Sequence, residues 1–238
     1  MTGGWVSLFS GGKDSSWALY RALERGLPIE RLLTIHPDGD SYMYHVPATE
    51  LASLASESLD IPLVDVSPGD LGAESATDVG AQGDAEVEHL ARALADLDDE
   101  LSGGLTGVIA GAVESEFQTS RIERVCHQLG IDLFAPIWGA DPSDLIRQMI
   151  DSGFEIVIVQ VAAYGLDESW LGRTIDAGTI EELERLNAEY GVHVLGEGGE
   201  FETIVTDGPH MDRPIRIEYE PHWDGTRGQI EIVDAWLG

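Results

Sequence analysis

Lysine is almost absent from this sequence. Lys13 is the only lysine in 238 residues, and the other twelve basic residues are arginines. Acidic residues outnumber basic ones by 44 to 13, which gives a formal net charge of −31. In molar salt the Debye length is about 3 Å, so such a surface hardly repels itself in a salt-rich cytoplasm. The composition favours adaptation to high salt over binding of a basic partner, and we expect no nucleic-acid ligand.

Cysteine and long apolar runs are also scarce. Cys126 is the single cysteine, which excludes a disulfide framework and a paired-cysteine metal or redox site. The longest apolar stretch, residues 154–165, contains Glu155 and Gln160 and is too short to cross a bilayer. The N-terminus carries no secretory leader pattern. We expect a cytoplasmic protein without a membrane partner, and no feature of the sequence indicates an oligomeric state.

The first part of the chain alternates apolar strands with amphipathic helices. We expect strands at 5–9, 31–35, 61–66, 106–113 and 131–137, helices at 15–25, 48–59, 84–101 and 117–129, and a mobile Gly- and Asp-rich loop at 69–83. This alternation predicts an α/β fold with a Rossmann-like parallel sheet and helices on both faces. Ligands of such sheets bind at the carboxyl ends of the strands.

The pattern changes after Trp138. Helices are expected at 141–153 and 179–191, the second with a capping box formed by Thr179 and Glu182. A strand is expected at 154–165, and the chain from His193 onward is mostly β-like. We therefore predict a first domain at 1–138 and a smaller α+β domain at 139–238.

The stretch SGGKDSS (10–16) lies between the first strand and the first helix. Its glycines let backbone N–H groups approach an anion, and the helix N-terminus adds a positive partial charge. Ser10 and Ser15 offer hydroxyls, Lys13 a full charge, and Asp14 a ligand for Mg²⁺, directly or through water. This is no Walker loop, because Asp14 follows the lysine and Ser7 stands where that motif needs glycine.

The stretch instead resembles the pyrophosphate loop, Ser-Gly-Gly-x-Asp-Ser, of the ATP pyrophosphatases. The resemblance implies the adenine nucleotide alpha-hydrolase (PP-loop) type of fold and cleavage of ATP between its α and β phosphates. The ATP-binding residues that it implies are Ser10, Gly11, Gly12, Lys13, Asp14, Ser15, His45 and Gly111.

Four later stretches narrow the resemblance. Residues 40–47, 111–141, 165–176 and 196–209 are similar, in order, to the diphthine–ammonia ligase family. The resemblance implies that ATP adenylates the carboxylate of diphthine, a modified histidine on translation elongation factor 2, and that ammonia then displaces AMP. The implied cofactors are ATP and Mg²⁺, and the implied partners are the modified factor and ammonium.

The resemblance also implies site residues beyond the glycine loop. The implied catalytic residues are Lys13, Asp14, Arg121 and Glu200, and the implied substrate-binding residues are Glu114, Ser115, Gln118, Glu197, Gly198, Gly199, Glu200 and Glu202. If 200–202 is extended, Glu200 and Glu202 project to one side and Phe201 to the other. A carboxylate there can orient ammonium or accept its proton. The plainer interpretation is that these acids form solvated surface, that Arg121 pairs with a nearby Glu, and that His45 is packed in a loop.

Two other functions stay open at this point. One is adenylation of a tRNA base, against which the single cysteine and the motifs of the second half argue. The other is a non-catalytic ATP-binding module such as the universal stress proteins. Their glycine-rich loop follows the fourth strand, whereas the loop here follows the first.

Overall fold

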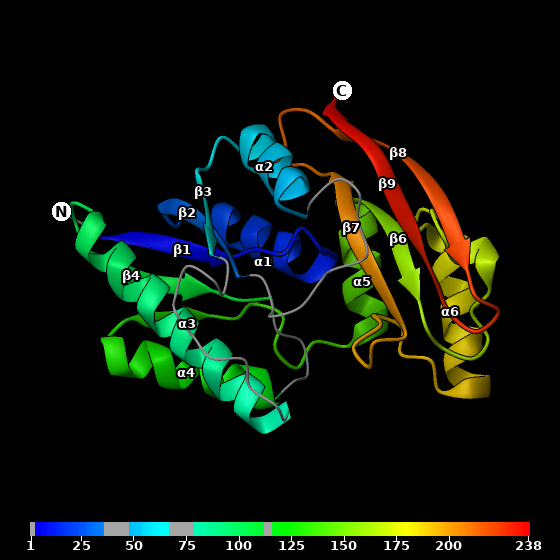
Figure 1. Ribbon diagram of the computed structural model, residues 1–238, viewed down its shortest axis with the longest axis horizontal. Helices are drawn as coiled ribbons and strands as arrows, with labels where there is room; N and C mark the ends of the chain where they lie inside the picture. The colour runs from blue at the N-terminus through cyan, green and yellow to red at the C-terminus, as the bar shows by residue number, and fades with distance from the viewer. Residues whose placement is uncertain (1–2, 36–47, 67–78, 112–115) are drawn as a thin grey trace.

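The computed structural model describes residues 3–35, 48–66, 79–111 and 116–238 (Figure 1). The chain forms two sheets, a parallel one in its first half and an antiparallel one in its second, which lie side by side in Figure 1. In these ranges, no helix is both long enough and apolar enough to cross a membrane.

The first sheet has the strand order β3-β2-β1-β4-β5, and all of its pairings are parallel. Its strands are β1 (Gly4–Leu8), β2 (Ile29–Ile35), β3 (Leu63–Val66), β4 (Leu105–Ile109) and β5 (Asp132–Phe134). The helices between them are α1 (Lys13–Glu24), α2 (Ala48–Leu59), α3 (Val79–Glu100) and α4 (Glu116–Leu129). The predicted Rossmann-like sheet is confirmed. Its strand order reverses between β1 and β4, which is where such sheets bind ligands.

Some predicted boundaries differ from the structure. Helix α3 begins at Val79, so the prediction of a loop is wrong for residues 79–83, while 69–78 lie outside the described residues. Once a helix is nucleated, each added residue contributes one more hydrogen bond, so a strong apolar stripe extends its helix backwards through small residues. Strand β5 ends at Phe134, three residues earlier than predicted, shortly before Pro136, which cannot donate a ladder hydrogen bond.

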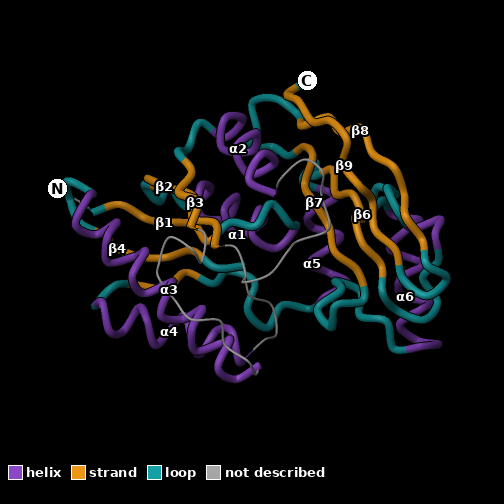
Figure 2. The backbone as a smooth tube through the Cα atoms, viewed as in Figure 1, coloured by secondary structure: helices purple, strands orange, loops and turns teal. Residues whose placement is uncertain are grey.

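The second sheet is antiparallel, with the order β7-β6-β9-β8. Its strands are β6 (Glu155–Val161), β7 (Phe201–Asp207), β8 (Ile215–Trp223) and β9 (Gly228–Leu237). Figure 2 shows the helices α5 (Pro142–Asp151) and α6 (Ala177–Tyr190) beside these strands. Buried side chains of both helices, such as Ile146 and Leu183, share one core with Ile156 and Ile158 of β6. The short 3-10 helix η2 (Glu168–Trp170) contributes Trp170 to this core.

Helix α6 begins differently from its prediction. Its N-cap is Asp176, whose carboxylate accepts hydrogen bonds from the Thr179 amide and hydroxyl, both at 2.8 Å. The predicted capping box is therefore wrong, because Glu182 forms a bidentate ion pair with Arg173 instead. The predicted C-terminal glycine is confirmed, since Gly191 adopts the left-handed conformation with φ 77°.

Helix α1 joins the two halves. Trp17 is buried in the core of the second half and packs edge-on against Phe154, with ring centroids 5.3 Å apart. Farther along the interface, Ser58 of α2 donates through its hydroxyl to the carbonyl of Arg213. These contacts hold the N-terminus of α1 beside the edge strand β7. The domain boundary near residue 138 stays a prediction.

Candidate functional site

The glycine loop follows β1 and is closed by its own serines. The hydroxyl of Ser15 donates to the Gly12 carbonyl at 3.1 Å and accepts the Ser10 amide at 3.2 Å. Gly11 has φ +77°, a conformation that favours glycine, and the space where a Cβ would stand is open. Gly12 is the N-cap of α1 and has no side chain with which to cap the amides of the first turn. This geometry suits an anion.

Lys13 and Asp14 form a partly buried ion pair at the start of α1. The Lys13 ammonium lies 2.8 Å from Asp14 Oδ2, and Lys13 is only 5 % exposed. It also lies 5.9 Å from the centre of the Phe201 ring. The other oxygen of Asp14, Oδ1, is buried and has no hydrogen-bond partner among the described residues. A buried carboxylate oxygen without a partner is costly in a protein interior, and a bound cation removes that cost.

Strand β7 holds the glycine loop in place. The Val205 amide donates to the Gly11 carbonyl at 2.9 Å, and the Lys13 amide donates to Thr203 Oγ1 at 3.4 Å. A Cβ on Gly12 would lie 3.3 Å from the Thr203 carbonyl oxygen. Because β7 is the outer strand of its sheet, the loop also covers an edge that would otherwise expose unpaired backbone groups. The sequence did not predict this contact, although Thr203 lies within the stretch 196–209 that resembles the ligase family.

Gly111 borders the same crevice from the end of β4. A Cβ at this position would lie 2.5 Å from the carbonyl oxygen of Asp14 and 2.6 Å from the Ser15 amide nitrogen. No other residue tolerates such an approach without moving the backbone, so Gly111 lets the end of β4 touch the first turn of α1. The structure thus brings Gly111 together with the loop residues, as the predicted site requires.

The turn before β7 is built by two acceptor side chains. Glu200 accepts hydrogen bonds from the His193 amide at 3.0 Å and from the Gly198 amide at 2.8 Å. His193 Nδ1 in turn accepts from the amides of Leu195 and Glu197. Strand β7 begins at Phe201, so Glu200 lies outside it, and its carboxylate folds back onto the turn instead of projecting beside Glu202. The exposed part of the turn is formed by Glu197, Gly198 and Gly199.

Glu202 and Arg121 are the other described candidates. The Glu202 side chain is exposed, yet the surrounding protein lowers the solvation of its carboxylate and raises its pKa. Arg121 is half-buried in the second turn of α4. His45, Glu114 and Ser115 lie outside the described residues, and Gln118 belongs to α4 without a described side chain.

The residues of the loop fit a nucleotide triphosphate and a divalent cation. The N-terminus of α1, which has no side-chain cap, and Lys13 suit phosphate oxygens, and Asp14 Oδ1, unpartnered among the described residues, suits a hard cation. Within the described ranges, no three His, Cys, Asp or Glu side chains gather as a protein-built metal site would need. A cation held by Asp14 would therefore complete its shell with phosphate and water oxygens, which is the usual arrangement for Mg²⁺.

Two family matches cover most of the chain. Residues 4–133 match the diphthamide synthase N-terminal domain, and residues 141–237 match the diphthamide synthase C-terminal domain. The first match contains the glycine loop and Gly111, and the second contains the turn at 193–200 and strand β7.

Individual proteins are similar over the same length. The diphthine–ammonia ligase of Rattus norvegicus is 35% identical over 242 residues, which cover 97% of this chain and 86% of that protein. The diphthine–ammonia ligase of Danio rerio is 34% identical over 244 residues, covering 97% and 90%. A crystal structure described as a "predicted subunit of tRNA methyltransferase" from Methanocaldococcus jannaschii overlaps loosely, with a TM-score of 0.45 and 19% identity over 88% of this chain and 98% of that one.

Proposed function

Because the chain belongs to the diphthamide synthase family, we propose that it is a diphthine–ammonia ligase, an enzyme that forms a C–N bond at the expense of ATP. Its substrates are ATP, ammonia and the diphthine residue of translation elongation factor 2, and its products are diphthamide, AMP and pyrophosphate. The observation that carries this proposal is the contact between the two recognised motifs. The glycine loop, suited to ATP, is hydrogen-bonded to the strand that follows the acidic turn.

The chemistry requires an activated carboxylate. A carboxylate does not condense with ammonia in water, because its oxygen is a poor leaving group. In the first step the diphthine carboxylate oxygen attacks the α-phosphorus of ATP, and the bond to pyrophosphate breaks. In the second step the nitrogen lone pair of ammonia attacks the acyl carbon, the bond to the AMP oxygen breaks, and the nitrogen loses a proton to a base.

The glycine loop serves the first step. Lys13 and the first-turn amides of α1 stabilise the negative charge that moves onto the departing pyrophosphate. Their positions are fixed before ATP arrives, since Thr203, Val205 and Ser15 already bind the loop. Asp14 is the residue that would hold Mg²⁺, which supplies further neutralisation of phosphate charge. Arg121 is proposed to contact the phosphate or the acyl-adenylate.

The acidic turn serves the second step. Diphthine carries a quaternary trimethylammonium group and the second substrate arrives largely as ammonium, so both favour carboxylates. Glu202 fits the role of proton acceptor, because its raised pKa brings its basicity closer to that of the proton donor. Glu197 is exposed on the turn that precedes β7 and is proposed to attract the cations. The predicted contact of Glu200 with substrate stays a prediction, since its carboxylate already accepts two backbone hydrogen bonds.

The proposed reaction belongs in the cytoplasm, where the elongation factor works. The test uses purified protein in high KCl with ATP, Mg²⁺, ammonium and diphthine-bearing factor. We expect one AMP for each factor modified, and a mass loss of about one dalton on the factor as OH becomes NH₂. AMP release without that mass change would contradict the amidation. Tight ATP binding without any AMP, with every substrate present, would favour the non-catalytic module.

A further inference from the structure

A line of polar side chains crosses the second sheet on one face. Glu202 of β7 is paired with Gln160 of β6, Gln160 with Gln229 of β9, and Gln229 with His222 of β8. Residues paired directly across neighbouring strands point to the same face of a sheet. These four side chains, here called the polar row, therefore lie next to one another from one edge of the sheet to the other.

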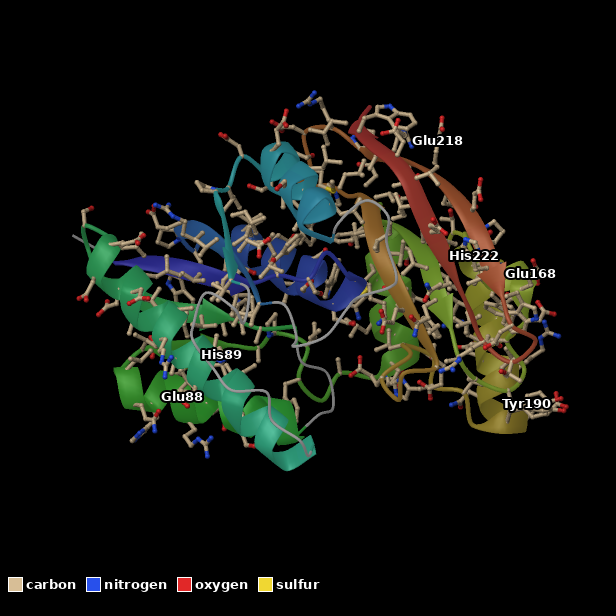
Figure 3. All side chains as sticks on the ribbon, viewed as in Figure 1. Glu88, His89, Glu168, Tyr190, Glu218 and His222 are labelled. Atoms are coloured by element: carbon tan, nitrogen blue, oxygen red, sulfur yellow. The ribbon has the colours of Figure 1, made fainter. Side chains whose placement is uncertain are left out.

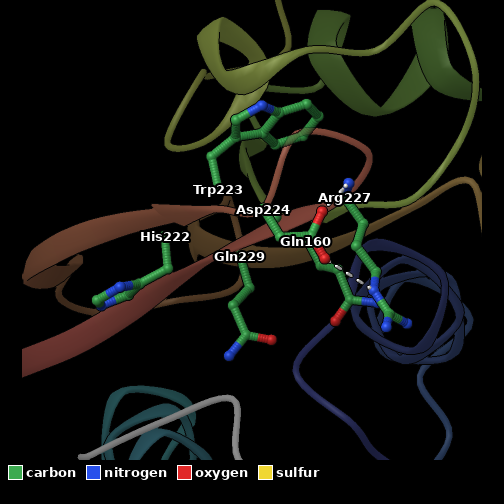
Figure 4. A pocket seen from close by; sticks show the side chains of 7 residues that line it. Gln160, His222, Trp223, Asp224, Arg227 and Gln229 are labelled. Carbon is green, nitrogen blue, oxygen red and sulfur yellow. Dashed lines mark hydrogen bonds and ion pairs between the residues drawn. The ribbon is translucent and has the colours of Figure 1, made fainter.

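On the opposite face of the sheet, the row of residues next to the polar row carries no polar side chain except the indole of a tryptophan. The neighbouring row is formed by Phe201, Val161, Gly228 and Trp223, which pair in the same way. Figure 4 shows His222 and Gln229 on one side of the strands and Trp223 on the other. Ile230 and Ile232 of β9 are fully buried, whereas His222 is exposed. The polar row thus lies on the side of the β8–β9 ribbon that is turned away from the apolar core.

A cavity of about 390 Å³ opens along the polar row. Three members of the row, Gln160, Gln229 and His222, line it. The rest of the lining is formed by Trp223 and Gly228 of the neighbouring row and by the turn residues Asp224 and Arg227, which form an ion pair (Figure 4). His222 Nε2 lies 2.5 Å from a carboxylate oxygen of Glu231. Figure 3 places His222 on this ribbon, well away from His89 of α3 in the first half. The volume is within the usual range of ligand sites.

Gln160 is the unusual member of the row. It interrupts the apolar run at the end of strand β6, in which Ile158, Val159 and Val161 are buried. Strand β6 is central, but Gln160 is only partly buried, and its side chain reaches the cavity. No hydrogen bond of its amide is found among the described residues. A glutamine amide has both donors and an acceptor, and it matches the N–H and C=O groups of a polypeptide backbone.

The polar row begins at the edge strand β7, which borders the glycine loop. Glu202 lies between Phe201 and Thr203, whose side chains point to the other face of the strand and contact Lys13 there. Strands are about 4.8 Å apart, so the row is about 14 Å long, the length of about four extended residues. The reacting carboxylate belongs to a residue within a protein, and the chain on either side of that residue has to lie against the enzyme next to the glycine loop.

We propose that the polar row binds the main chain of the elongation-factor segment that flanks diphthine, with Glu202 nearest the reacting residue and Gln160 and Gln229 bonding to backbone amides. This inference rests on the proposed function. It adds a site for the polypeptide part of the substrate, and Glu202 and Glu231 give that site the negative charge that suits a segment bearing a cationic side chain.

The test compares Gln160→Leu/Gln229→Leu with Gln148→Leu, a substitution of the same kind at an exposed position of α5. Leucine keeps the approximate size and removes the amide. We measure binding of purified diphthine-bearing factor in molar KCl, and the KM values for factor, ATP and ammonium. The double variant should raise the dissociation constant and the KM for the factor by at least about tenfold, as expected for two lost hydrogen bonds. The KM of the double variant for ATP should stay unchanged. The control variant Gln148→Leu should change neither the dissociation constant nor any of the KM values.

Two results would overturn the inference. One is an unchanged affinity for the factor, and the other is a rise in the KM for ATP with the factor unaffected, which would assign the cavity to the nucleotide. If Gln160→Leu does not fold, Gln160→Asn replaces it, because asparagine shortens the side chain without introducing an apolar one. The single variant Gln229→Leu is then measured in the same assays. Failure of the proposed function is seen separately, because the unmodified enzyme would then produce no diphthamide.

Discussion

At the scale of single residues, the proposed site contains one residue whose type occurs nowhere else in the chain. Lys13 is the single lysine, and it is buried against Asp14 and near the Phe201 ring. An ammonium is compact and can follow charge from ATP to pyrophosphate, while a guanidinium is planar and larger. A preference for arginine explains the loss of lysine at other positions, and the confined space at position 13 explains why one is kept.

The first prediction follows from that confinement. Lys13→Arg keeps the charge but overfills a site that is 5 % exposed, so AMP formation should fall by about 100-fold or more. Arg21→Lys, a charge-preserving change at an exposed position of the same helix, is the control and should leave the rate unchanged. Near-normal AMP formation by Lys13→Arg would mean that the lysine is not required.

His210 is a second unusual residue, because it is a histidine packed among aromatic rings. Its ring stacks on Phe154 at 5.0 Å, lies 5.7 Å from Tyr20, and its Nδ1 is buried without a partner in the described structure. Burial lowers the pKa of His210 to about 4 from the usual 6.5. The folded protein therefore disfavours the protonated form.

The second prediction is a pH dependence of stability. Above pH 6.5 the histidine is mostly neutral in both the folded and the unfolded state. As the pH falls from 6.5 towards 4, His210 becomes protonated in the unfolded chain but stays neutral in the folded protein, so the folded protein loses stability. His210→Phe removes this effect. Between pH 6.5 and 5 the free energy of unfolding of the native protein should fall by about 2 kcal/mol relative to that of the variant. The free energy of unfolding is measured by chemical denaturation at each pH. If it falls equally in the native protein and in His210→Phe, the pH dependence does not come from His210.

At the scale of elements, the pairing of strand β7 with the glycine loop is the main finding. The strand belongs to the second half of the chain, yet its Thr203 and Val205 hold Gly11 and Lys13 of the first. Loops that bind phosphate work best when their donors are already in position, because ordering them upon binding costs affinity. The proposed ATP site therefore depends on residues of the second half as well as on the glycine loop.

The third prediction tests that contribution. Thr203→Val keeps the shape and removes the hydroxyl that accepts the Lys13 amide, so the KM for ATP should rise by about fivefold. Thr206→Val is the control on the same strand, since it removes a hydroxyl that bonds to Glu155 away from the loop. Equal effects of the two substitutions on the KM for ATP would show that the loop does not depend on Thr203.

At the scale of the whole molecule, charge is the dominant property. The net charge of −31 is carried by a chain of 25.7 kDa, and the acids are distributed along its length. Some are used in ion pairs, such as Glu184 with Arg147 and Glu182 with Arg173, but most have no basic residue to balance them. Repulsion between these negative charges destabilises the folded protein at low ionic strength.

The fourth prediction follows from this imbalance. Raising KCl from about 0.2 M to about 2 M shortens the Debye length from about 7 Å to about 2 Å and should raise the melting temperature, as followed by circular dichroism. The loss of a few surface ion pairs is a smaller effect, since each contributes little. A melting temperature that falls with added KCl would contradict adaptation to high salt.

Local patterns in the sequence determined the alternation of strands and helices, the glycine loop after β1 and the family to which the chain belongs. Such features depend on neighbouring residues, so periodicity and short motifs are enough to predict them. The tertiary structure alone decided that β7 borders the loop, that Glu200 folds back onto its turn, that Asp176 caps α6, and that Gln160 lies in line with Gln229 and His222. These depend on strand register and on competition between nearby side chains, and residues far apart in the chain become neighbours only when the sheets form and pack.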